Sequence, residues 1–199
     1  MTARRLNANF LSAEELSAFG VENATERNIL VHSTAVIVNF DSIRFGCNVR
    51  IDPYVVLSCS DLVLGDHVHI ASGCGIFGRE RVTLGDFSGF SSQGLIYSSN
   101  DDYSGNSLTG PTVPEEFIDL THAEVVIGKH CIIGVRTTLL PGACLEEGAA
   151  VGAGSLVKGT LPEWTISGGV PAKPFKARSR ECLIKEAELR AQQLASKST

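Results

Sequence analysis

The chain has 199 residues, of which 43% are hydrophobic and 20% are charged, and its formal net charge is −5 at pH 7. This length suits a single domain, 1–199, and the acidic balance argues against a nucleic-acid partner, because no surplus of basic residues can meet a phosphate backbone. No apolar stretch approaches the length of about eighteen residues that a membrane span needs, and the first ten residues lack a signal-peptide core, so we expect a cytoplasmic protein without a membrane span.

Residues 1–30 are predicted to form a helical cap. Ser12 followed by Glu15 is a capping-box pattern, and Gly20 is a natural stop for a helix. The sequence therefore predicts a short helix over residues 12–19. Repeat folds need such a cap because the end coil otherwise leaves its core open to water.

A repeat of six residues begins at Val31. Aliphatic residues recur at the repeat positions Val31, Ile37, Ile43, Val49 and Val55, and after three inserted residues at Leu64, Ile70 and Ile76. A second insertion contains the sequence Gly-Arg-Glu-Arg of residues 78–81, which is expected to bulge outward, and precedes Leu84, Phe90 and Ile96. The fourth position after these residues is usually small, and four cysteines occupy it: Cys47, Cys59, Cys74 and Cys131. A thiol there acts as a small hydrophobe, so we expect reduced, structural cysteines.

Residues 98–125 interrupt the repeat with a polar stretch that contains Gly105, Gly110, Pro111 and Pro114. Such a stretch cannot supply a coil of the repeat. A loop of this length inside a compact domain is usually functional or disordered. Because the repeat resumes directly after it, we expect an ordered excursion loop.

The repeat is most regular in residues 126–160, where six successive repeat positions are aliphatic: Ile127, Ile133, Leu139, Leu145, Val151 and Val157. A period of six matches neither the 3.6 of an α-helix nor the 2 of a β-strand. It is typical of a β-helix, in which short strands and tight turns alternate and stacked coils bury one continuous core. We therefore expect a mainly β fold with coils over residues 31–97 and 126–160.

Residues 161–199 leave the repeat, and a segment over about residues 179–195 is predicted to be a C-terminal helix because it is rich in Glu, Lys, Leu and Ala. Before it stands the sequence Gly169-Val170-Pro171-Ala172-Lys173. This sequence resembles the closing motif of the bacterial hexapeptide-repeat acyltransferase family, in the galactoside and maltose acetyltransferase group. The resemblance to these sugar O-acetyltransferases covers residues 31–178. It implies a left-handed parallel β-helix, acetyl-CoA as co-substrate and a homotrimer.

The resemblance places coenzyme A beside the last coils. Four basic residues near that end suit its phosphate groups: Lys158, Lys173, Lys176 and Arg178. Four small residues allow the pantetheine arm to lie against the backbone: Gly134, Gly152, Gly154 and Ser155. Trp164 packs either near the adenine or in the core or at the closing end of the β-helix.

Acyl transfer needs a group that takes the proton of the acceptor. In the resembled group a histidine at the start of the long loop has this role, and alignment on Thr83-Leu84-Gly85-Asp86 places Asp101 in its column. Three possibilities stay open. Asp101 or Asp102 acts as a base with a raised pKa, His122 folds back from the far end of the loop, or the acceptor is an amine that the aspartates orient. Four further side chains are expected to contact the acceptor: His69, Tyr97, Asn100 and Tyr103.

The function expected from the resemblance is acetyl transfer from acetyl-CoA to a sugar hydroxyl, in surface-polysaccharide or nucleotide-sugar metabolism. One alternative is N-acetylation of an amino-sugar nucleotide. Alternatives of another class are a zinc lyase like the γ-type carbonic anhydrases, or a silent β-helix scaffold. The histidines and cysteines lack the spacing of a zinc site, so no metal is expected.

Overall fold

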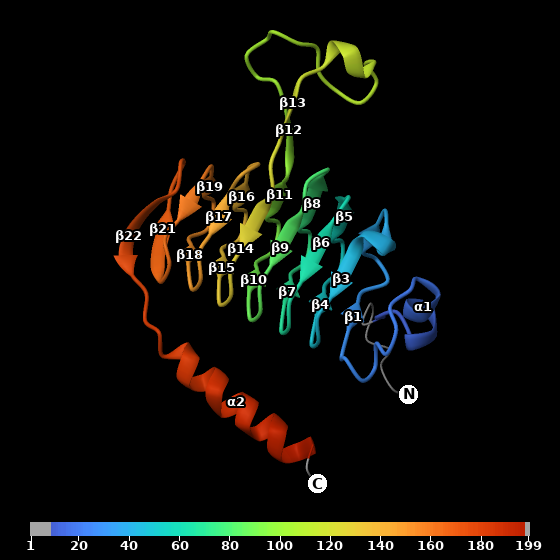
Figure 1. Cartoon of the computed structure of the whole chain (residues 1–199), viewed down its shortest axis with the longest axis vertical. Helices are drawn as coiled ribbons and strands as arrows, with labels where there is room; N and C mark the ends of the chain where they lie inside the picture. The colour runs from blue at the N-terminus through green and yellow to red at the C-terminus, as the bar shows by residue number, and fades with distance from the viewer. Residues whose placement is uncertain (1–8, 198–199) are drawn as a thin grey trace, which may run out of the picture.

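The computed structural model describes residues 9–197 and is a parallel β-helix of about seven turns (Figure 1). Short strands stack into three flat sheets, which form the faces of a prism. The predicted β-helix is therefore confirmed. Neither helix in the described part of the chain is long and apolar enough to cross a membrane.

The chain visits the three faces in turn, and neighbouring strands on a face are parallel, apart from the antiparallel pair β21 and β22. The first face contains β1 (Leu30–Val31), β4 (Arg50–Ile51), β7 (His69–Ile70), β10 (Gly89–Phe90), β15 (Ile132–Ile133), β18 (Ala150–Val151), β21 (Thr165–Gly168) and β22 (Lys173–Ala177). The second contains β2 (Val36–Ile37), β5 (Val56–Cys59), β8 (Gly75–Gly78), β11 (Leu95–Tyr97), β16 (Thr138–Leu139) and β19 (Leu156–Val157). The third contains β3 (Ile43–Phe45), β6 (Leu62–Leu64), β9 (Val82–Leu84), β14 (Val125–Ile127), β17 (Cys144–Leu145) and β20 (Thr160–Leu161).

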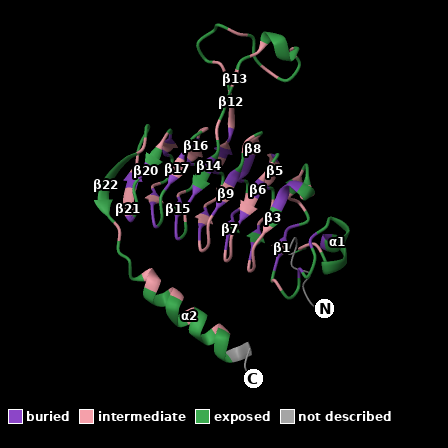
Figure 2. Cartoon of the chain, in the orientation of Figure 1, coloured by how far each residue is buried: buried purple, intermediate pink, exposed green. Residues whose placement is uncertain are grey.

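The core is a set of inward columns in which each coil places an apolar side chain over that of the coil before it. On the second face, Ile76 pairs with Ile96 and Ile96 pairs with Leu139, and all three side chains are fully buried. Figure 2 shows this buried layer running along the strands of the body. Burial of these columns is the main source of stability, at about 25 cal/mol for each Å² of apolar surface removed from water.

The predicted register is wrong in the second coil. Ile51 lies over Val31 and Leu57 lies over Ile37, so Ile51 and Leu57 occupy the positions that the sequence assigned to Val49 and Val55. Both valines are nevertheless buried, at corner positions just before these strands. On the third face Phe45, not Ile43, pairs with Leu64, so the step from Ile37 is eight residues instead of six. The two extra residues lie in the turn that contains the short 3₁₀ helix Phe40–Ser42, and they shift the next coil by two residues.

This shift also changes the place of two cysteines. Cys74 and Cys131 precede inward residues by two positions, at the small corner place, and burial raises the pKa of each thiol to about 11. Cys47 and Cys59 do not occupy that place. All six cysteines are free thiols.

Both predicted helices form. Helix α1 (Ala13–Ala18) begins after Ser12, whose side chain accepts from the Glu15 amide while Glu15 accepts from the Ser12 amide, so the capping box is confirmed. The first eight residues of the predicted cap lie outside the described residues. Helix α2 (Cys182–Lys197) follows β22. Two short 3₁₀ helices span Phe40–Ser42 and Glu115–Phe117.

Helix α2 packs on a ladder of rings at one corner of the prism. His67, Phe87 and His130 stack in successive coils with ring centroids 4.5 and 5.3 Å apart. All three have positive φ, a conformation that the tight turn requires. Glu186 of α2 pairs with His130 at 2.8 Å, and Arg190 lies over the Phe87 ring. These contacts fix the C-terminal segment on the body.

Residues 98–124 leave the body between β11 and β14. The excursion rises on a two-stranded antiparallel hairpin, formed by β12 (Ser99–Asp101) and β13 (Leu120–His122), and ends in a loop that stands clear of the prism (Figure 1). The hairpin side of the body is thereby separated from the side on which α2 lies.

Candidate functional site

The hairpin brings together residues from the two ends of the excursion loop. Ser99 is directly opposite His122, and Asp101 is opposite Leu120. Because side chains alternate along a strand, Ser99, Asp101 and His122 belong to one face of the hairpin. The structure thus places His122 on the same hairpin as Asp101.

A hydrogen-bond chain connects His122 to the body. The Ser99 hydroxyl lies 2.7 Å from Nδ1 of His122 and accepts a hydrogen bond of 2.8 Å from the backbone amide of Arg79. Arg79 belongs to the Gly-Arg-Glu-Arg insertion that follows β8. The insertion predicted as an outward bulge is therefore part of the site.

The base of the hairpin is fixed by close packing. Gly78 has a φ of +127°, and a Cβ there would lie 2.3 Å from the Ser98 hydroxyl oxygen and 2.7 Å from the Ser99 nitrogen. Ser98 is fully buried and donates to the Glu80 carbonyl oxygen at 2.8 Å. Only glycine fits at position 78, so the bulge lies against the first hairpin strand.

The two neighbouring aspartates have different surroundings. Asp102 accepts hydrogen bonds from the amides of Ser104, Asn106 and Ser107 and from the Ser107 hydroxyl. These bonds, led by those from Ser104, lower the pKa of Asp102 to about 2. Asp102 thus organises the turn of residues 102–107. Asp101 accepts only a longer bond of 3.3 Å, from the Gly110 amide, among the contacts of the described residues.

A groove runs along the base of the hairpin. It consists of two adjoining cavities of about 470 and about 400 Å³, both lined by Gly78, Arg79 and Ser99. The first continues toward Ser58 and Ser60, and the second is lined by a set that includes Asn100 and Asp101. We call these two cavities the hairpin groove. Its size suits a ligand of small-molecule dimensions.

The four expected acceptor contacts are not all in one place. Asn100 lines the hairpin groove. Tyr97 stacks on Phe77, which lines it, with ring centroids 5.4 Å apart. Tyr103 lies in the outer loop and is 86% exposed. His69 lies on the first face of the prism, where it pairs with Asp52 at 2.9 Å, and has no place in the groove lining.

The small residues expected beside coenzyme A have packing roles as well. A Cβ on Gly134 would lie 2.6 Å from the backbone nitrogen of Ala153 in the next coil. The Ser155 hydroxyl donates to the Gly152 carbonyl oxygen and accepts from the Gly169 amide. Gly154 has positive φ, with open space where a side chain would stand. Gly134 and Ser155 therefore hold the coils together, whereas Gly154 borders free space.

The four expected cations also divide into two groups. Lys158, Lys173 and Lys176 are exposed at the last coils. The Arg178 guanidinium instead donates to the carbonyl oxygens of His130 and Gly148, at 2.6 and 2.8 Å. Arg178 also lies over the ring of Trp164.

Trp164 closes the same corner of the prism. Its side chain is buried, and its ring lies 6.0 Å from that of His130. A Cβ on Gly148 would lie 2.4 Å from the Trp164 ring. The surroundings of Trp164 match packing at the C-terminal end of the prism. Arg178 likewise fixes the end of the prism, so the three lysines are the exposed members of the four predicted cations.

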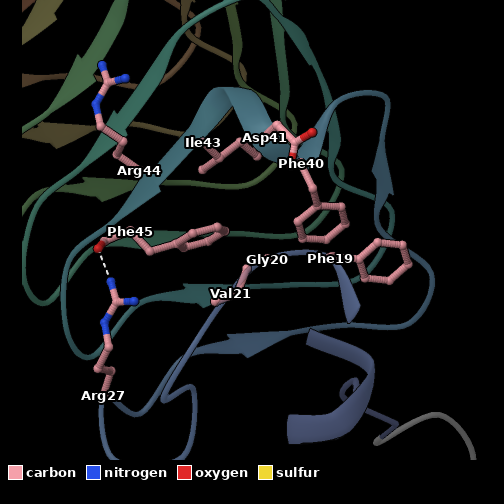
Figure 3. Close-up of a pocket in the computed structure, with 9 residues that line it drawn as sticks. All are labelled: Phe19, Gly20, Val21, Arg27, Phe40, Asp41, Ile43, Arg44 and Phe45. Carbon is pink, nitrogen blue, oxygen red and sulfur yellow. Dashed lines mark hydrogen bonds between the residues drawn. The ribbon is translucent and has the colours of Figure 1, made fainter. Parts of the chain in front are cut away.

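A separate cavity of about 360 Å³ lies between the N-terminal cap and the first coils (Figure 3). Phe19 and Phe40 stack there with ring centroids 4.6 Å apart. The Arg27 guanidinium donates to the carbonyl oxygens of Phe45 and Gly46. Arg27 thus joins the cap to the first coil, and this cavity belongs to the closure of the prism.

A metal site would need several ligating side chains close together. Within residues 9–197, no group of three or more His, Cys, Asp or Glu side chains is arranged to hold a metal ion.

Sequence reasoning did not identify Arg79 and Ser99 as site residues. The signal for Arg79 was the insertion of residues 78–81, which breaks the repeat at the coil directly before the excursion. Ser99 lacked a comparable signal, because serine is ordinary in polar loops. Only the pairing of β12 with β13 brings its hydroxyl to His122.

Comparisons with known proteins bear on this site. No protein-family model matches the chain. The chain is 39% identical over 176 residues to the dTDP-4-amino-4,6-dideoxy-D-glucose acyltransferase of Escherichia coli, a match that covers 87% of this chain and 91% of that protein. It is 32% identical over 168 residues to the putative lipopolysaccharide biosynthesis O-acetyl transferase WbbJ of Escherichia coli K12, with coverage of 79% and 83%.

Crystal structures of AntD, an N-acyltransferase from Bacillus cereus, have the same fold. The complex of AntD with dTDP and 3-hydroxybutyryl-CoA superposes with a TM-score of 0.84 at 38% identity, covering 96% of this chain and 98% of AntD. A variant of AntD in complex with dTDP-4-amino-4,6-dideoxyglucose and coenzyme A gives a TM-score of 0.87 at 37% identity, covering 92% and 98%.

Proposed function

Because the chain belongs to the hexapeptide-repeat acyltransferase family, we propose that it transfers an acyl group from acyl-coenzyme A to the amino group of a nucleotide-activated amino sugar. The observation that carries this proposal is the similarity, over almost the whole chain, to two enzymes that act on or bind dTDP-4-amino-4,6-dideoxyglucose. The sequence placed a sugar hydroxyl first and an amine second. The relatives favour the reverse order.

Asp101 is the residue that we assign to proton transfer. It lines the hairpin groove, and its carboxylate accepts one long hydrogen bond from the Gly110 amide. In the reaction, the amine nitrogen attacks the thioester carbonyl carbon, a C–N bond forms and the C–S bond breaks. Asp101 takes the proton that the nitrogen loses, and the sulfur leaves as a thiolate that is then protonated.

His122 has a supporting role in this proposal. Its imidazole is hydrogen-bonded to Ser99 through Nδ1, and it lies outside the lining of both cavities. The bonds of Asp102 to its own turn, which lower its pKa to about 2, favour Asp101 over Asp102 as the base. We therefore assign to His122 and Asp102 the task of holding the hairpin in shape. Asn100 borders the acceptor, and Tyr97 supports the groove wall through Phe77.

The donor is assigned to the last coils. The exposed lysines Lys158, Lys173 and Lys176 supply positive charge for the phosphates of coenzyme A. Gly152 and Gly154 allow close approach of its pantetheine arm to the backbone, since a Cβ at Gly154 would meet open space.

We also propose a homotrimer. The outer loop carries the apolar side chains of Tyr103, Leu108 and Phe117, which are 86%, 59% and 55% exposed, and no part of residues 9–197 covers them. A neighbouring subunit covers them in this proposal. Light scattering at micromolar concentration tests it: a trimer mass is expected, and a monomer mass rules it out.

O-acylation is the second candidate, because the chain is 32% identical to a putative O-acetyl transferase. The deciding experiment supplies acetyl-CoA together with either dTDP-4-amino-4,6-dideoxyglucose or the matching sugar that has a hydroxyl at the same carbon. Thiol release gives the rate, and mass spectrometry with NMR gives the new linkage. We expect amide formation with the amino sugar. Ester formation with the hydroxyl sugar, and no reaction of the amino sugar, contradicts the proposal.

A further inference from the structure

We propose that Arg79 binds the diphosphate of the acceptor and thereby directs the amino end of the sugar toward Asp101. This inference rests on the proposed function and adds a specificity-determining residue to it. Arg79 is the basic residue in the lining of both cavities of the hairpin groove. It is central to the groove because the two cavities meet at Gly78, Arg79 and Ser99.

The backbone at Arg79 is held firmly, although its side chain is exposed. Gly78 allows the bulge to approach Ser98 and Ser99 closely. The Arg79 amide then donates to the Ser99 hydroxyl at 2.8 Å. A guanidinium on a fixed backbone loses less freedom when it binds a ligand, and it can meet two phosphate oxygens at once.

Arg79 differs from the neighbouring arginines in its ion pair, which is more exposed than theirs. Arg81, two residues later, donates to Asp61 at 2.7 Å, and Arg44 pairs with the same carboxylate. Arg79 pairs with Glu115 of the excursion loop at 3.3 Å, and the two side chains are 60% and 82% exposed. An ion pair this exposed is weak, so a diphosphate can replace Glu115 at little cost.

The charges of the groove match an amino-sugar nucleotide. Arg79 is positive and Asp101 is negative, and both line the second cavity. In the acceptor, the anionic diphosphate joins the nucleoside to one side of the sugar ring, and the amino group stands on the opposite side of that ring. Only one orientation pairs both charges favourably, with the diphosphate on Arg79 and the amine on Asp101. The same cation also favours an anionic acceptor in a chain whose formal net charge is −5.

Coenzyme A also contains a diphosphate, so the position of Arg79 must decide whether it meets the diphosphate of the acceptor or that of coenzyme A. Arg79 follows β8, in the third coil, whereas Lys173 and Lys176 lie on β22 at the end of the prism. The donor phosphates are assigned to those lysines. Arg79 is therefore assigned to the acceptor, and its removal should leave coenzyme A binding unchanged.

The test compares Arg79→Gln with Arg81→Gln, a matched control from the same bulge. Binding of dTDP and of coenzyme A is measured separately by calorimetry on the full chain. Arg79→Gln should weaken dTDP binding about tenfold to a hundredfold, as expected for loss of charge-assisted hydrogen bonds. Arg81→Gln should change it less than about twofold, and both variants should bind coenzyme A as the parent does.

Turnover adds a second readout. Arg79→Gln should raise KM for dTDP-4-amino-4,6-dideoxyglucose with a small change in kcat, and should leave the KM of the free amino sugar unchanged. Equal dTDP binding by parent and Arg79→Gln overturns the inference, as does a loss confined to coenzyme A. If the parent acylates the amine while Arg79→Gln binds dTDP normally, only this inference fails. If no variant acylates an amine, the proposed function fails.

Discussion

The β-helix body and the excursion of residues 98–124 follow different rules. In the body, each coil repeats the one before it, and inward side chains such as Ile96 are fully buried. In the excursion, no residue from Ser99 to His122 is buried, as Figure 2 also shows. The body is specified by apolar packing, and the hairpin by polar side chains that bond to one another and to the bulge at Arg79. Substitutions in the body should therefore change stability, and substitutions in the hairpin should change rate.

The largest expected effect on stability comes from a cavity in the body. Ile96→Ala should lower the free energy of unfolding by about 2–5 kcal/mol, because a fully buried side chain is truncated. Thr112→Ala, at an exposed side chain in the outer loop, should change it by less than about 0.5 kcal/mol. Urea unfolding measures both. Equal losses in the two variants would mean that the excursion is packed as tightly as the body.

A smaller loss of stability is expected at a glycine that lies in close contact with the next coil. Gly134→Ala places a Cβ 2.6 Å from the Ala153 nitrogen, and should cost about 1–3 kcal/mol of stability by overpacking. Gly159→Ala is the control, since its Cβ meets nothing within 4 Å. Urea midpoints compare the two. If Gly134→Ala keeps full stability and loses only coenzyme A binding, Gly134 serves the donor rather than the coils.

The hydroxyl that connects the hairpin to the bulge should affect rate. Ser99→Ala removes the bonds to His122 and to the Arg79 amide. Loss of bonds worth about 0.5–1.5 kcal/mol each should raise KM for the acceptor several-fold, with little change in the urea midpoint. Steady-state kinetics at saturating acyl-CoA measure this. An unchanged KM with a lower midpoint would show that Ser99 only supports the fold.

The smallest effect is confined to the turn that Asp102 organises. Because the folded-state pKa is depressed to about 2, its carboxylate keeps its bonds above the ordinary pKa near 4, and loses them as pH falls through about 2. Amide exchange at Ser104 and Asn106 should therefore stay slow at pH 4 and become faster near pH 2. In Asp102→Ala it should be fast at both. Slow exchange in that variant would show that Asp102 does not stabilise the turn.

The contrast between the repeating body and the excursion also explains which features the sequence could predict. The aliphatic period of six and the capping box at Ser12 predict the coils and the first helix correctly, because each rests on local chemistry repeated in the chain. The error at Val49 and Val55 arose because valine also fits the corner position. Ile43 kept the step of six, so the sequence did not reveal the two extra residues in the turn at Phe40–Ser42 or the inward place of Phe45.

The site was harder to predict than the coils. The pattern placed Asp101 and His122 in one loop, but the cross-strand pair of Ser99 and His122 depends on a hairpin register. Serine, asparagine and aspartate are poor strand formers, so residues 99–101 did not resemble a strand. Arg178 looked like a free cation, yet it is held by two carbonyl oxygens, of His130 and Gly148, that are far from it in the sequence.

The central claim is that the acceptor amine reacts at the base of the hairpin, beside Asp101. The most direct test is kcat/KM against pH for Asp101→Asn and His122→Asn with acetyl-CoA and dTDP-4-amino-4,6-dideoxyglucose. Asp101→Asn should lower kcat/KM on the order of a hundredfold or more, since it removes the proton acceptor but keeps the side-chain size. His122→Asn should stay within about threefold of the parent, as a residue that only supports the hairpin. If His122→Asn abolishes turnover while Asp101→Asn remains near the parent, the claim is contradicted.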